Sequence, residues 1–413
     1  MNQHLLSEPR AAHDISLQAE TIGVAALIVL AAAVLCWRWV GFQGHDDASY
    51  ADAALAWVEH FPALGTSHWA LRYPLVLPAA GLIALFGPST LALVAGNLVA
   101  YAAFLVTGYL VARSWFGWVA AALLTLIYIV LPQFPVQATY ANPDLLEMSL
   151  AIGSFWALMR ARARGGQIAP LVLSGVLAGL GFLTRETSLL LIALYGLLFL
   201  FSPAMPRWRY LLVGFGFMLV VGMQIGYFAA RTGDPFYRSR ISAQHDTVDR
   251  GAKLADAQNA GAALDGEGVL ATNVWVAPLA AVFVSQKYGL LFFLAIPAYL
   301  ILRRSGWMTR RQASVVDCAG LGALVAFLFV ALNGSILYVV PRYFMVSAAL
   351  AAVPVAVLGA RWLEAGGLRR WLAGFGAAGF VFGSYRVFCW YRPYWRQQGE
   401  PLWKQQPLML GSV

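Results

Sequence analysis

Two adjacent carboxylates, Asp46 and Asp47, follow the first long apolar run of the sequence, within "GHDDASY". Only 11% of the residues are charged, so paired acids at the end of an apolar segment are unusual here. A carboxylate placed beside a reacting hydroxyl or amine can act as its general base. Asp46 also suits the N-cap of a helix, because it is followed at helical spacing by Tyr50, Ala53, Ala54 and Trp57. We therefore expect a structured element to hold Asp46 in place.

Further polar segments interrupt the apolar sequence, each beside a long apolar run. They are "SHWALRYP" with Arg72 and Tyr73, "TYANPDLLE" with Asp144, "LTRETS" with Arg185, and "NGSILYVVPRYF" with Arg342 and Tyr343. Ionisable groups at membrane depth are costly and are functional candidates for that reason. Guanidinium groups offer planar, multidentate donors that match a phosphate. The set predicts group transfer involving an anionic substrate embedded in the membrane.

The composition places the chain among integral membrane proteins. Its 413 residues are 60% hydrophobic, with a mean hydropathy of +0.68, whereas a soluble domain carries about 25% charged residues. The formal charge of +9 does not indicate nucleic-acid binding, because membrane proteins collect Arg and Lys in cytoplasmic loops. The cysteines Cys36, Cys318 and Cys389 form no CxxC pair, so neither a disulfide framework nor a thiolate metal site is indicated.

The apolar runs predict an all-α polytopic bundle and a single transmembrane domain over residues 1–413. A spanning helix needs roughly 20 apolar residues. Such runs predict about eleven spans, near 21–40, 89–112, 116–133, 145–160, 168–183, 188–202, 210–230, 288–302, 315–332, 343–360 and 371–388. Two further apolar pieces, 74–87 and 269–284, are short or interrupted, and we expect them to lie in the interface or dip partway in.

Loop charges predict the topology. With a cytoplasmic N-terminus and neither short piece crossing, every inner loop is basic; these loops carry Arg113, Arg160, Arg162, Arg164, Arg207, Arg209, Arg303, Arg304, Arg310, Arg311, Arg361, Arg369 and Arg370. The polar segments then share the outer face, in a first outer loop at 41–87 and in later loops that include a large one at 231–287. The basic C-terminal tail also falls outside, where it either re-enters or rests on anionic headgroups.

In order along the chain, these motifs resemble those of the GT-C membrane glycosyltransferases that use polyprenyl-phosphate sugars. The resemblance is to the branch of protein O-mannosyltransferases and lipid A aminoarabinose transferases. In that branch an Asp-Glu pair follows the first helix, with a Tyr four residues after the Asp. Asp46 and Tyr50 have this spacing, and Asp47 stands where Glu is common. The motif "LRYP" with Arg72 is present without the lysine that the family adds before the proline.

Later motifs extend the resemblance over residues 20–230 and weakly to about 360. Asp144 in "YANPDLLE" matches the second acidic motif, and Arg185 in "GLGFLTRE" replaces the lysine of a "TK" motif. Arg342 and Tyr343 match a late basic residue beside a tyrosine. The resemblance implies a GT-C-like bundle with interfacial helices at the outer face.

The resemblance also implies a reaction. An acceptor deprotonated by Asp46 would attack the sugar C1 with inversion while the lipid phosphate leaves, held by Arg72, Arg185 and Arg342. The other substrate-binding candidates are Asp47, Tyr50, Tyr73, Asp144 and Tyr343. The implied partners are a polyprenyl-phosphate sugar, membrane lipids and a glycan, lipid or protein acceptor. The implied location is a bacterial inner membrane, with the active site on the outer face.

Other readings remain open at this point. The branch resembled here generally needs no metal, although His45, Asp46 and Asp144 offer the oxygen and nitrogen ligands of a divalent site. A transporter or flippase for an anionic lipid-linked substrate would also place arginines in the membrane, but would usually show internal repeats and broken helices near the midplane. A scaffold with this fold and no catalysis is the third alternative.

Overall fold

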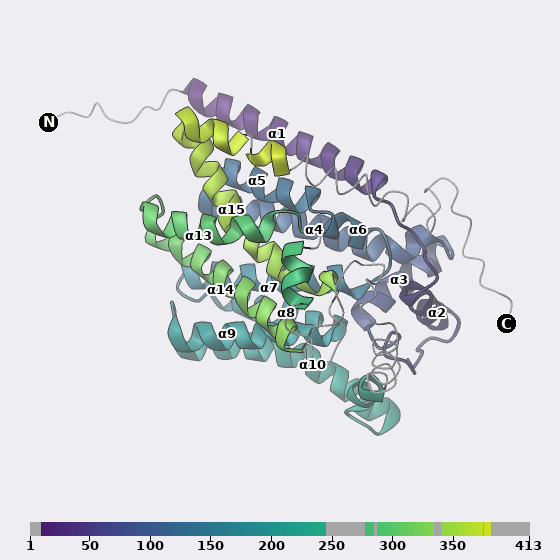
Figure 1. Cartoon of the computed structure of the whole chain (residues 1–413). Coiled ribbons are helices and arrows are strands. Elements are labelled where there is room, and N and C mark those ends of the chain that lie inside the picture. Colours follow the sequence, from purple (N-terminus) through teal and green to yellow (C-terminus); the bar gives the residue numbers. More distant parts are fainter. Residues whose placement is uncertain (1–9, 245–276, 285–286, 334–339, 375, 381–413) are drawn as a thin grey trace.

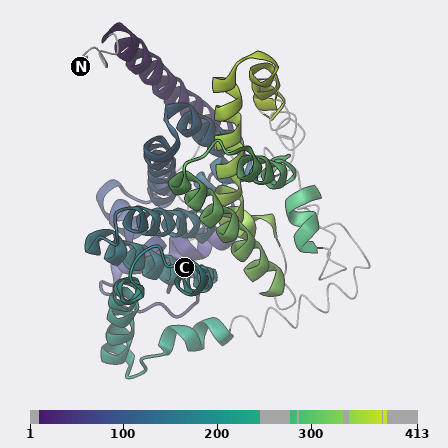
Figure 2. The same ribbon diagram turned by 90° about the vertical axis from the view of Figure 1, so that its left-hand side faces the viewer.

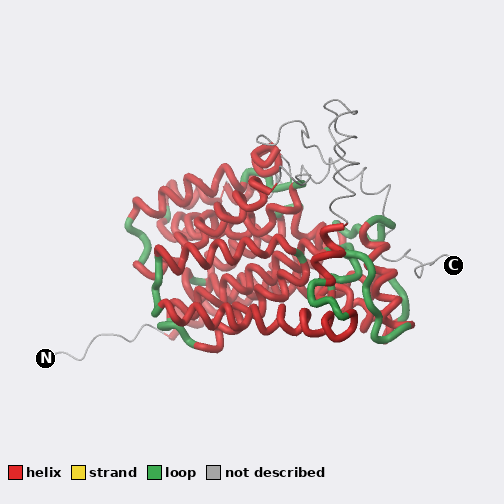
Figure 3. The backbone as a smooth tube through the Cα atoms, turned by 90° about the horizontal axis from the view of Figure 1, so that it is seen from below, coloured by secondary structure: helices red, strands yellow, loops and turns green. Residues whose placement is uncertain are grey.

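A computed structural model of the chain describes residues 10–244, 277–284, 287–333, 340–374 and 376–380. Within these ranges the chain forms helices joined by loops and contains no strand (Figure 3). The all-α fold predicted from the apolar runs is therefore confirmed. Most of the predicted loop 231–287, the end of the predicted span 371–388 and the basic tail lie outside the described residues.

Each apolar run predicted between residues 21 and 360 coincides with a helix. These helices are α1 (Arg10–Trp37), α4 (Thr90–Phe116), α5 (Trp118–Val130), α7 (Pro143–Ala163), α8 (Ile168–Thr184), α9 (Leu190–Phe201), α10 (Tyr210–Thr232), α13 (Leu291–Ser305), α14 (Arg310–Asn333) and α15 (Met345–Ala365). By length and composition, five segments of the described chain can cross a membrane: Gln18–Trp37, Thr90–Phe116, Arg207–Thr232, Arg310–Leu332 and Pro341–Ala365. Several of the others are shorter apolar helices of 10–17 residues. The chain is thus an integral membrane protein.

Short elements complete the bundle. They are α2 (Asp46–Glu59), α3 (Tyr73–Phe86), α6 (Gln133–Ala138), α12 (Ala277–Leu279), the π-helical turn Ala280–Val284, and the 3-10 turns η1 (Glu186–Leu189), η2 (Arg207–Arg209) and η4 (Pro341–Phe344). The helix expected after Asp46 and the helix expected at 74–87 are both present, as α2 and α3. They pack on each other through a small apolar cluster that includes Tyr50, Ala54 and Val76.

The long helices alternate in direction, so their connections gather at the two ends of the bundle (Figure 1). One end carries α2 and α3, the starts of α4, α7 and α15, and the ends of α8 and α10. The arginines assigned to inner loops lie in connections at the opposite end. Helix α1 follows one edge of the bundle, and its N-terminal part projects from it (Figure 2). The described residues of all five polar segments therefore lie at the same end.

Close packing between α8 and α10 fixes the position of the connection that follows α8. A Cβ at Gly175 would collide with the Val213 carbonyl oxygen, and one at Gly216 with the Val172 carbonyl oxygen. Small residues let helices approach closely in a membrane, where packing rather than hydrophobic burial drives association. Helix α8 also packs along α7. Its C-terminal end, which leads into Arg185, is thereby held beside the start of α7.

Candidate active site

The two adjacent aspartates have different environments. Asp47 is 2% exposed, and its carboxylate accepts the backbone N–H groups of Gln43 at 2.5 Å and His45 at 2.8 Å. Asp46 is the first residue of α2 rather than its N-cap; His45 occupies that position without a side-chain cap. The N-cap prediction for Asp46 was therefore wrong, because Asp47 makes the hydrogen bonds that order the helix start. The Asp46 side chain remains 51% exposed.

Asp144 brings two arginines together at the start of α7. The Asn142 side chain caps this helix by accepting the N–H groups of Asp144 and Leu145, which fixes the position of the Asp144 carboxylate. The Asp144 side chain is 4% exposed and forms an ion pair with Arg185 through Oδ1. Its Oδ2 lies 3.5 Å from Nε of Arg342. Three segments that are distant in sequence thus meet at one buried carboxylate.

Arg342 also links this group to the exposed acid of α2. Its Nη2 atom lies 3.9 Å from Oδ2 of Asp46. The guanidinium of Arg185 lies over the ring of Tyr343, 4.0 Å from its centroid, a cation–π arrangement. Burial lowers the pKa of Arg185, and the nearby positive charges of Arg72 and Arg342 lower it further. An arginine nevertheless stays protonated, so the three side chains repel one another, and an anion between them would relieve this repulsion.

Arg72 forms the other side of the site. Its Nη1 donates a hydrogen bond to the hydroxyl of Tyr50, and it interacts electrostatically with Glu186 and Asp46. Burial raises the pKa of Tyr50, although the charge of Arg72 counteracts part of this effect. The phenol therefore stays neutral and positions the guanidinium. Tyr73 instead packs edge-on against Trp57, with ring centroids 5.6 Å apart.

The arrangement has an uncompensated positive charge. Arg72, Arg185 and Arg342 contribute +3, and Asp46 and Asp144, which form ion pairs with Arg185 and Arg342, contribute −2, which leaves +1. Glu186 also interacts with Arg72, but Arg238 balances its charge. Opposite charges at short range in a poorly solvated site interact strongly. The cluster suits a singly charged phosphodiester, and a half-exposed carboxylate stands beside it.

Sequence reasoning did not select three further residues of this region. Glu147, 6% exposed, accepts hydrogen bonds from Thr187 at 2.6 Å and Ser188 at 3.0 Å. Arg238 donates to Glu186 at 2.7 Å. The glutamates lie in motifs that the sequence singled out, but nothing in the sequence marks Arg238. Only its burial separates it from the nearby Arg240, which is 56% exposed against 7% for Arg238.

No group of three or more His, Cys, Asp or Glu side chains in the described ranges is arranged to hold a metal ion. His45, Asp46 and Asp144 therefore do not assemble as the alternative metal site would require. Asp144 is instead engaged by two arginines, and His45 uses its backbone N–H to bind Asp47.

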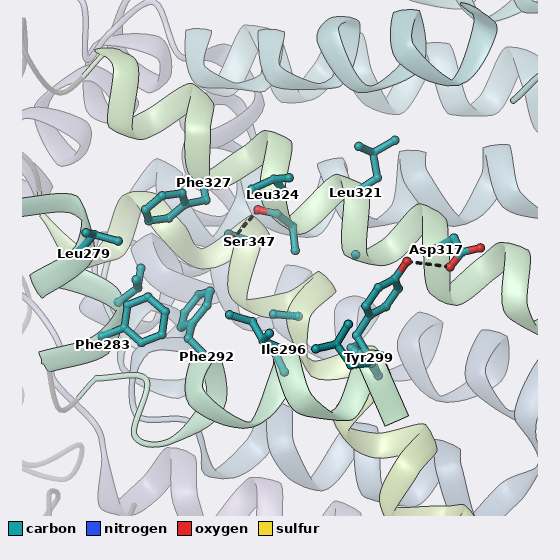
Figure 4. Close-up of a pocket in the computed structure, with 17 residues that line it drawn as sticks. Leu279, Phe283, Phe292, Ile296, Tyr299, Asp317, Leu321, Leu324, Phe327 and Ser347 are labelled. Atoms are coloured by element: carbon teal, nitrogen blue, oxygen red, sulfur yellow. Dashed lines mark hydrogen bonds between the residues drawn. The ribbon is translucent and has the colours of Figure 1, made fainter. Parts of the chain in front are cut away.

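An apolar cavity of about 540 Å³ opens between α13, α14 and α15, close to the residues that bring Arg342 into the site (Figure 4). Its lining includes Phe292, Leu324 and Phe327, and Ser347 and Ala351 of α15. Ser347 follows the η4 turn by one helical turn, so the cavity begins near Arg342 and Tyr343. Its polar side chains are few: Ser347, whose hydroxyl donates to the Ala323 carbonyl oxygen at 2.8 Å, and the pair Tyr299 and Asp317 at the far end (Figure 4).

Comparison with known proteins agrees with this architecture. Residues 73–228 match the model of the dolichyl-phosphate-mannose-protein mannosyltransferase family. The crystal structure of apo ArnT from Cupriavidus metallidurans matches with a TM-score of 0.61 and 16% identity, covering 92% of this chain and 73% of ArnT. ArnT bound to undecaprenyl phosphate matches with a TM-score of 0.60 and 16% identity over 91% and 72% of the two chains.

The apo oligosaccharyltransferase of Archaeoglobus fulgidus matches with a TM-score of 0.58 and 15% identity, covering 88% of this chain but only 55% of the archaeal one. No curated protein sequence matches the chain. The chain has the fold of these GT-C membrane proteins. The resemblance to the branch that includes protein mannosyltransferases and the aminoarabinose transferase ArnT is thereby confirmed.

Proposed function

We propose that the protein is an inverting glycosyltransferase that takes its sugar from a polyprenyl-phosphate donor. The observation that carries the proposal is the meeting of Arg185 and Arg342 at the buried Asp144, with Asp46 half-exposed beside Arg342. The fold supports it, since the solved relatives include one that binds undecaprenyl phosphate and one in complex with dolichol phosphate.

In the proposed reaction, Asp46 accepts a proton from the acceptor hydroxyl as the hydroxyl oxygen attacks C1 of the sugar. The new bond forms at C1 while the bond from C1 to the phosphate oxygen breaks. Its electron pair passes to the phosphate, which changes from a singly charged diester to a more highly charged monoester. Arg72, Arg185 and Arg342 stabilise that developing charge. No acid is required for the leaving phosphate, so one carboxylate suffices and the configuration at C1 inverts.

The apolar cavity along α15 suits part of the isoprenoid tail. It begins one helical turn beyond Arg342 and Tyr343 and is lined almost entirely by apolar side chains. A lipid whose phosphate lies at Arg342 would bring its first isoprene units to this opening. We propose that the cavity holds them and so keeps C1 near Asp46.

We place the site at the outer face of a bacterial inner membrane, with the N-terminus in the cytoplasm. The end of the bundle opposite the site carries the arginines of the basic connections, among them Arg113, Arg207 and Arg303. Positive residues are retained on the cytoplasmic side of membrane proteins. A flippase for the same lipid is the alternative function; it would move undecaprenyl phosphate sugar across a vesicle without releasing undecaprenyl phosphate.

Replacing Arg342 tests the phosphate site. Arg342→Ala removes a group that contacts both Asp46 and Asp144, and a hydrogen bond to a charged group contributes about 1.5–3 kcal/mol. We expect the Kd for undecaprenyl phosphate, measured on purified protein in nanodiscs, to rise by about 10- to 100-fold. Vesicles that contain an undecaprenyl-phosphate sugar, supplied with a cell-envelope extract as the source of acceptor, should also release undecaprenyl phosphate more slowly with this variant than with the wild-type protein.

The matched control for this test is Arg240→Ala. Arg240 pairs with Asp234 at 2.8 Å on the same end of the molecule but is 56% exposed. Its removal takes away the same charge without touching the site, so the Kd should stay within a factor of about two. Equal effects of the two variants would show that the affinity follows general charge rather than a phosphate site.

Filling the apolar cavity tests the tail assignment. Leu324 lines the cavity and is 53% exposed, so Leu324→Trp adds volume without overpacking a closed core. We expect KM for a donor with a full undecaprenyl chain to rise at least about fivefold, a loss of about 1 kcal/mol. Leu110→Trp on α4, 58% exposed, is the control and should leave KM unchanged. A rise as large for a donor whose phosphate carries a methyl group in place of the prenyl chain would contradict the assignment.

A further inference from the structure

Beside the phosphate site lies a second charged pair that the proposed reaction does not use. Glu186 follows Arg185 directly in η1, and its side chain is 46% exposed. Arg238 lies in the segment after α10, is 7% exposed, and donates from Nη2 to Oε1 of Glu186 at 2.7 Å. The pair lies near Arg72, because Arg72 interacts electrostatically with Glu186 as well as with Asp46.

The buried arginine holds this carboxylate in a fixed position. Besides Glu186, Arg238 donates to the Phe182 carbonyl oxygen at 3.0 Å and to Gln224 at 3.5 Å. Its guanidinium also lies 5.3 Å from the centroid of the Phe182 ring. An ordinary surface ion pair has both side chains in solvent, whereas Arg238 makes three further contacts besides its pair with Glu186. The result is an exposed carboxylate with a rigid support, placed next to the arginine of a phosphate site.

Aromatic rings border the same region. Tyr73 follows Arg72, and its ring lies 6.0 Å from that of Tyr227 and 5.9 Å from that of Phe228. Tyr237, next to Arg238, packs against Phe228 at 5.4 Å. A carboxylate beside aromatic rings can accept hydrogen bonds from hydroxyl groups while the rings pack against an apolar face. This is the chemistry required to bind a sugar, which presents hydroxyl donors and an apolar ring face.

We propose that Glu186, positioned by Arg238, binds hydroxyl groups of the sugar on the donor and selects neutral sugars. This inference rests on the proposed function, since it places the sugar next to a phosphate held by Arg72 and Arg185. The sugar is neutral because Arg238 already balances the charge of Glu186. When the donor is bound, its phosphate balances the +1 left by the three arginines and Arg238 balances Glu186, so no unpaired negative charge remains for the ammonium group of an amino sugar.

The test compares the lipid phosphate with and without its sugar. Undecaprenyl phosphate and undecaprenyl-phosphate donors carrying mannose, glucose, galactose or 4-amino-4-deoxyarabinose are titrated against protein in nanodiscs. We expect at least one neutral sugar to bind more tightly than undecaprenyl phosphate. Glu186→Gln keeps an acceptor oxygen for Arg238. It should raise the Kd for that neutral donor by about 10- to 100-fold and leave the Kd for undecaprenyl phosphate unchanged.

The control is Asp234→Asn, which neutralises an acid in an ion pair with Arg240 on the same segment and should leave every Kd unchanged. Three results would overturn the proposal. In the first, no donor with a neutral sugar binds more tightly than undecaprenyl phosphate. In the others, Glu186→Gln weakens the binding of donor and of undecaprenyl phosphate equally, or lowers the affinity for the amino-sugar donor more than for the neutral donors. A wild-type protein that binds none of the lipids would instead refute the proposed function. An unchanged thermal midpoint for Glu186→Gln shows that the fold is intact.

Discussion

Asp46→Asn should abolish sugar transfer while lipid binding persists. General-base catalysis contributes about 10²- to 10⁴-fold to a rate, and we expect kcat to fall by at least about 10³-fold in this range. The asparagine has the same shape but cannot accept the acceptor's proton. The helix start should not suffer, because Asp47 and not Asp46 binds the backbone N–H groups of Gln43 and His45.

Asp46→Asn should lower kcat but should not weaken the binding of undecaprenyl phosphate. Removing the carboxylate changes the sum for the three arginines and the two acids from +1 to +2, so the phosphate site becomes more positive. The Kd for undecaprenyl phosphate should therefore stay the same or fall by a few fold. A loss of activity together with tighter lipid binding is not expected from a damaged fold.

The measurement is the rate of undecaprenyl phosphate release under saturating donor, with a cell-envelope extract as the source of acceptor, and the Kd comes from titration in nanodiscs. Asp52→Asn is the matched control, since Asp52 lies exposed on the same helix α2 and its neutralisation should leave kcat unchanged. A wild-type kcat for Asp46→Asn would refute the base assignment. Lipid translocation that continues without sugar release in both proteins would favour the flippase.

The fold could be predicted from the sequence because membrane spans leave a strong pattern. Apolar runs of membrane length have few alternatives, and α4, α10 and α14 begin and end close to the predicted limits. The charge of the connections then predicted which segments share an end of the bundle. That argument brought Asp46, Asp144, Arg185 and Arg342 to one place without any structure.

The contacts within the site could not be predicted in the same way. Asp46 and Asp47 are adjacent and chemically identical, and the choice of N-cap depends on where the loop before α2 turns. The pairing of Arg185 with Asp144 requires the crossing of α7 and α8, which depends on the close approach of α8 and α10 at Gly175 and Gly216. A single sequence records residue types but not these helix contacts.

Arg185→Ala should damage both stability and binding, and a second substitution should separate the two effects. Asp144 is 4% exposed and Arg185 13% exposed, so removing the arginine leaves a buried carboxylate with only Arg342 near it. Breaking a buried pair in this way costs about 3–5 kcal/mol in soluble proteins. Arg342 remains at 3.5 Å, so we expect a loss of about 2–3 kcal/mol in the free energy of unfolding, measured by titration with SDS.

Asp144→Ala in the Arg185→Ala background removes the buried carboxylate that has lost one of its two arginines. It should restore at least about 1 kcal/mol of the lost stability, within the usual range of coupling between contacting residues. Affinity for undecaprenyl phosphate should not return, because the missing guanidinium is a phosphate ligand. The exposed pair Arg303 and Asp317, 46% and 39% exposed at 3.2 Å, provides the control cycle, with an expected coupling below about 1 kcal/mol. If the double variant recovered lipid binding together with stability, Arg185 would serve only as the counter-ion of Asp144, and the phosphate would have to be held by Arg72 and Arg342 alone.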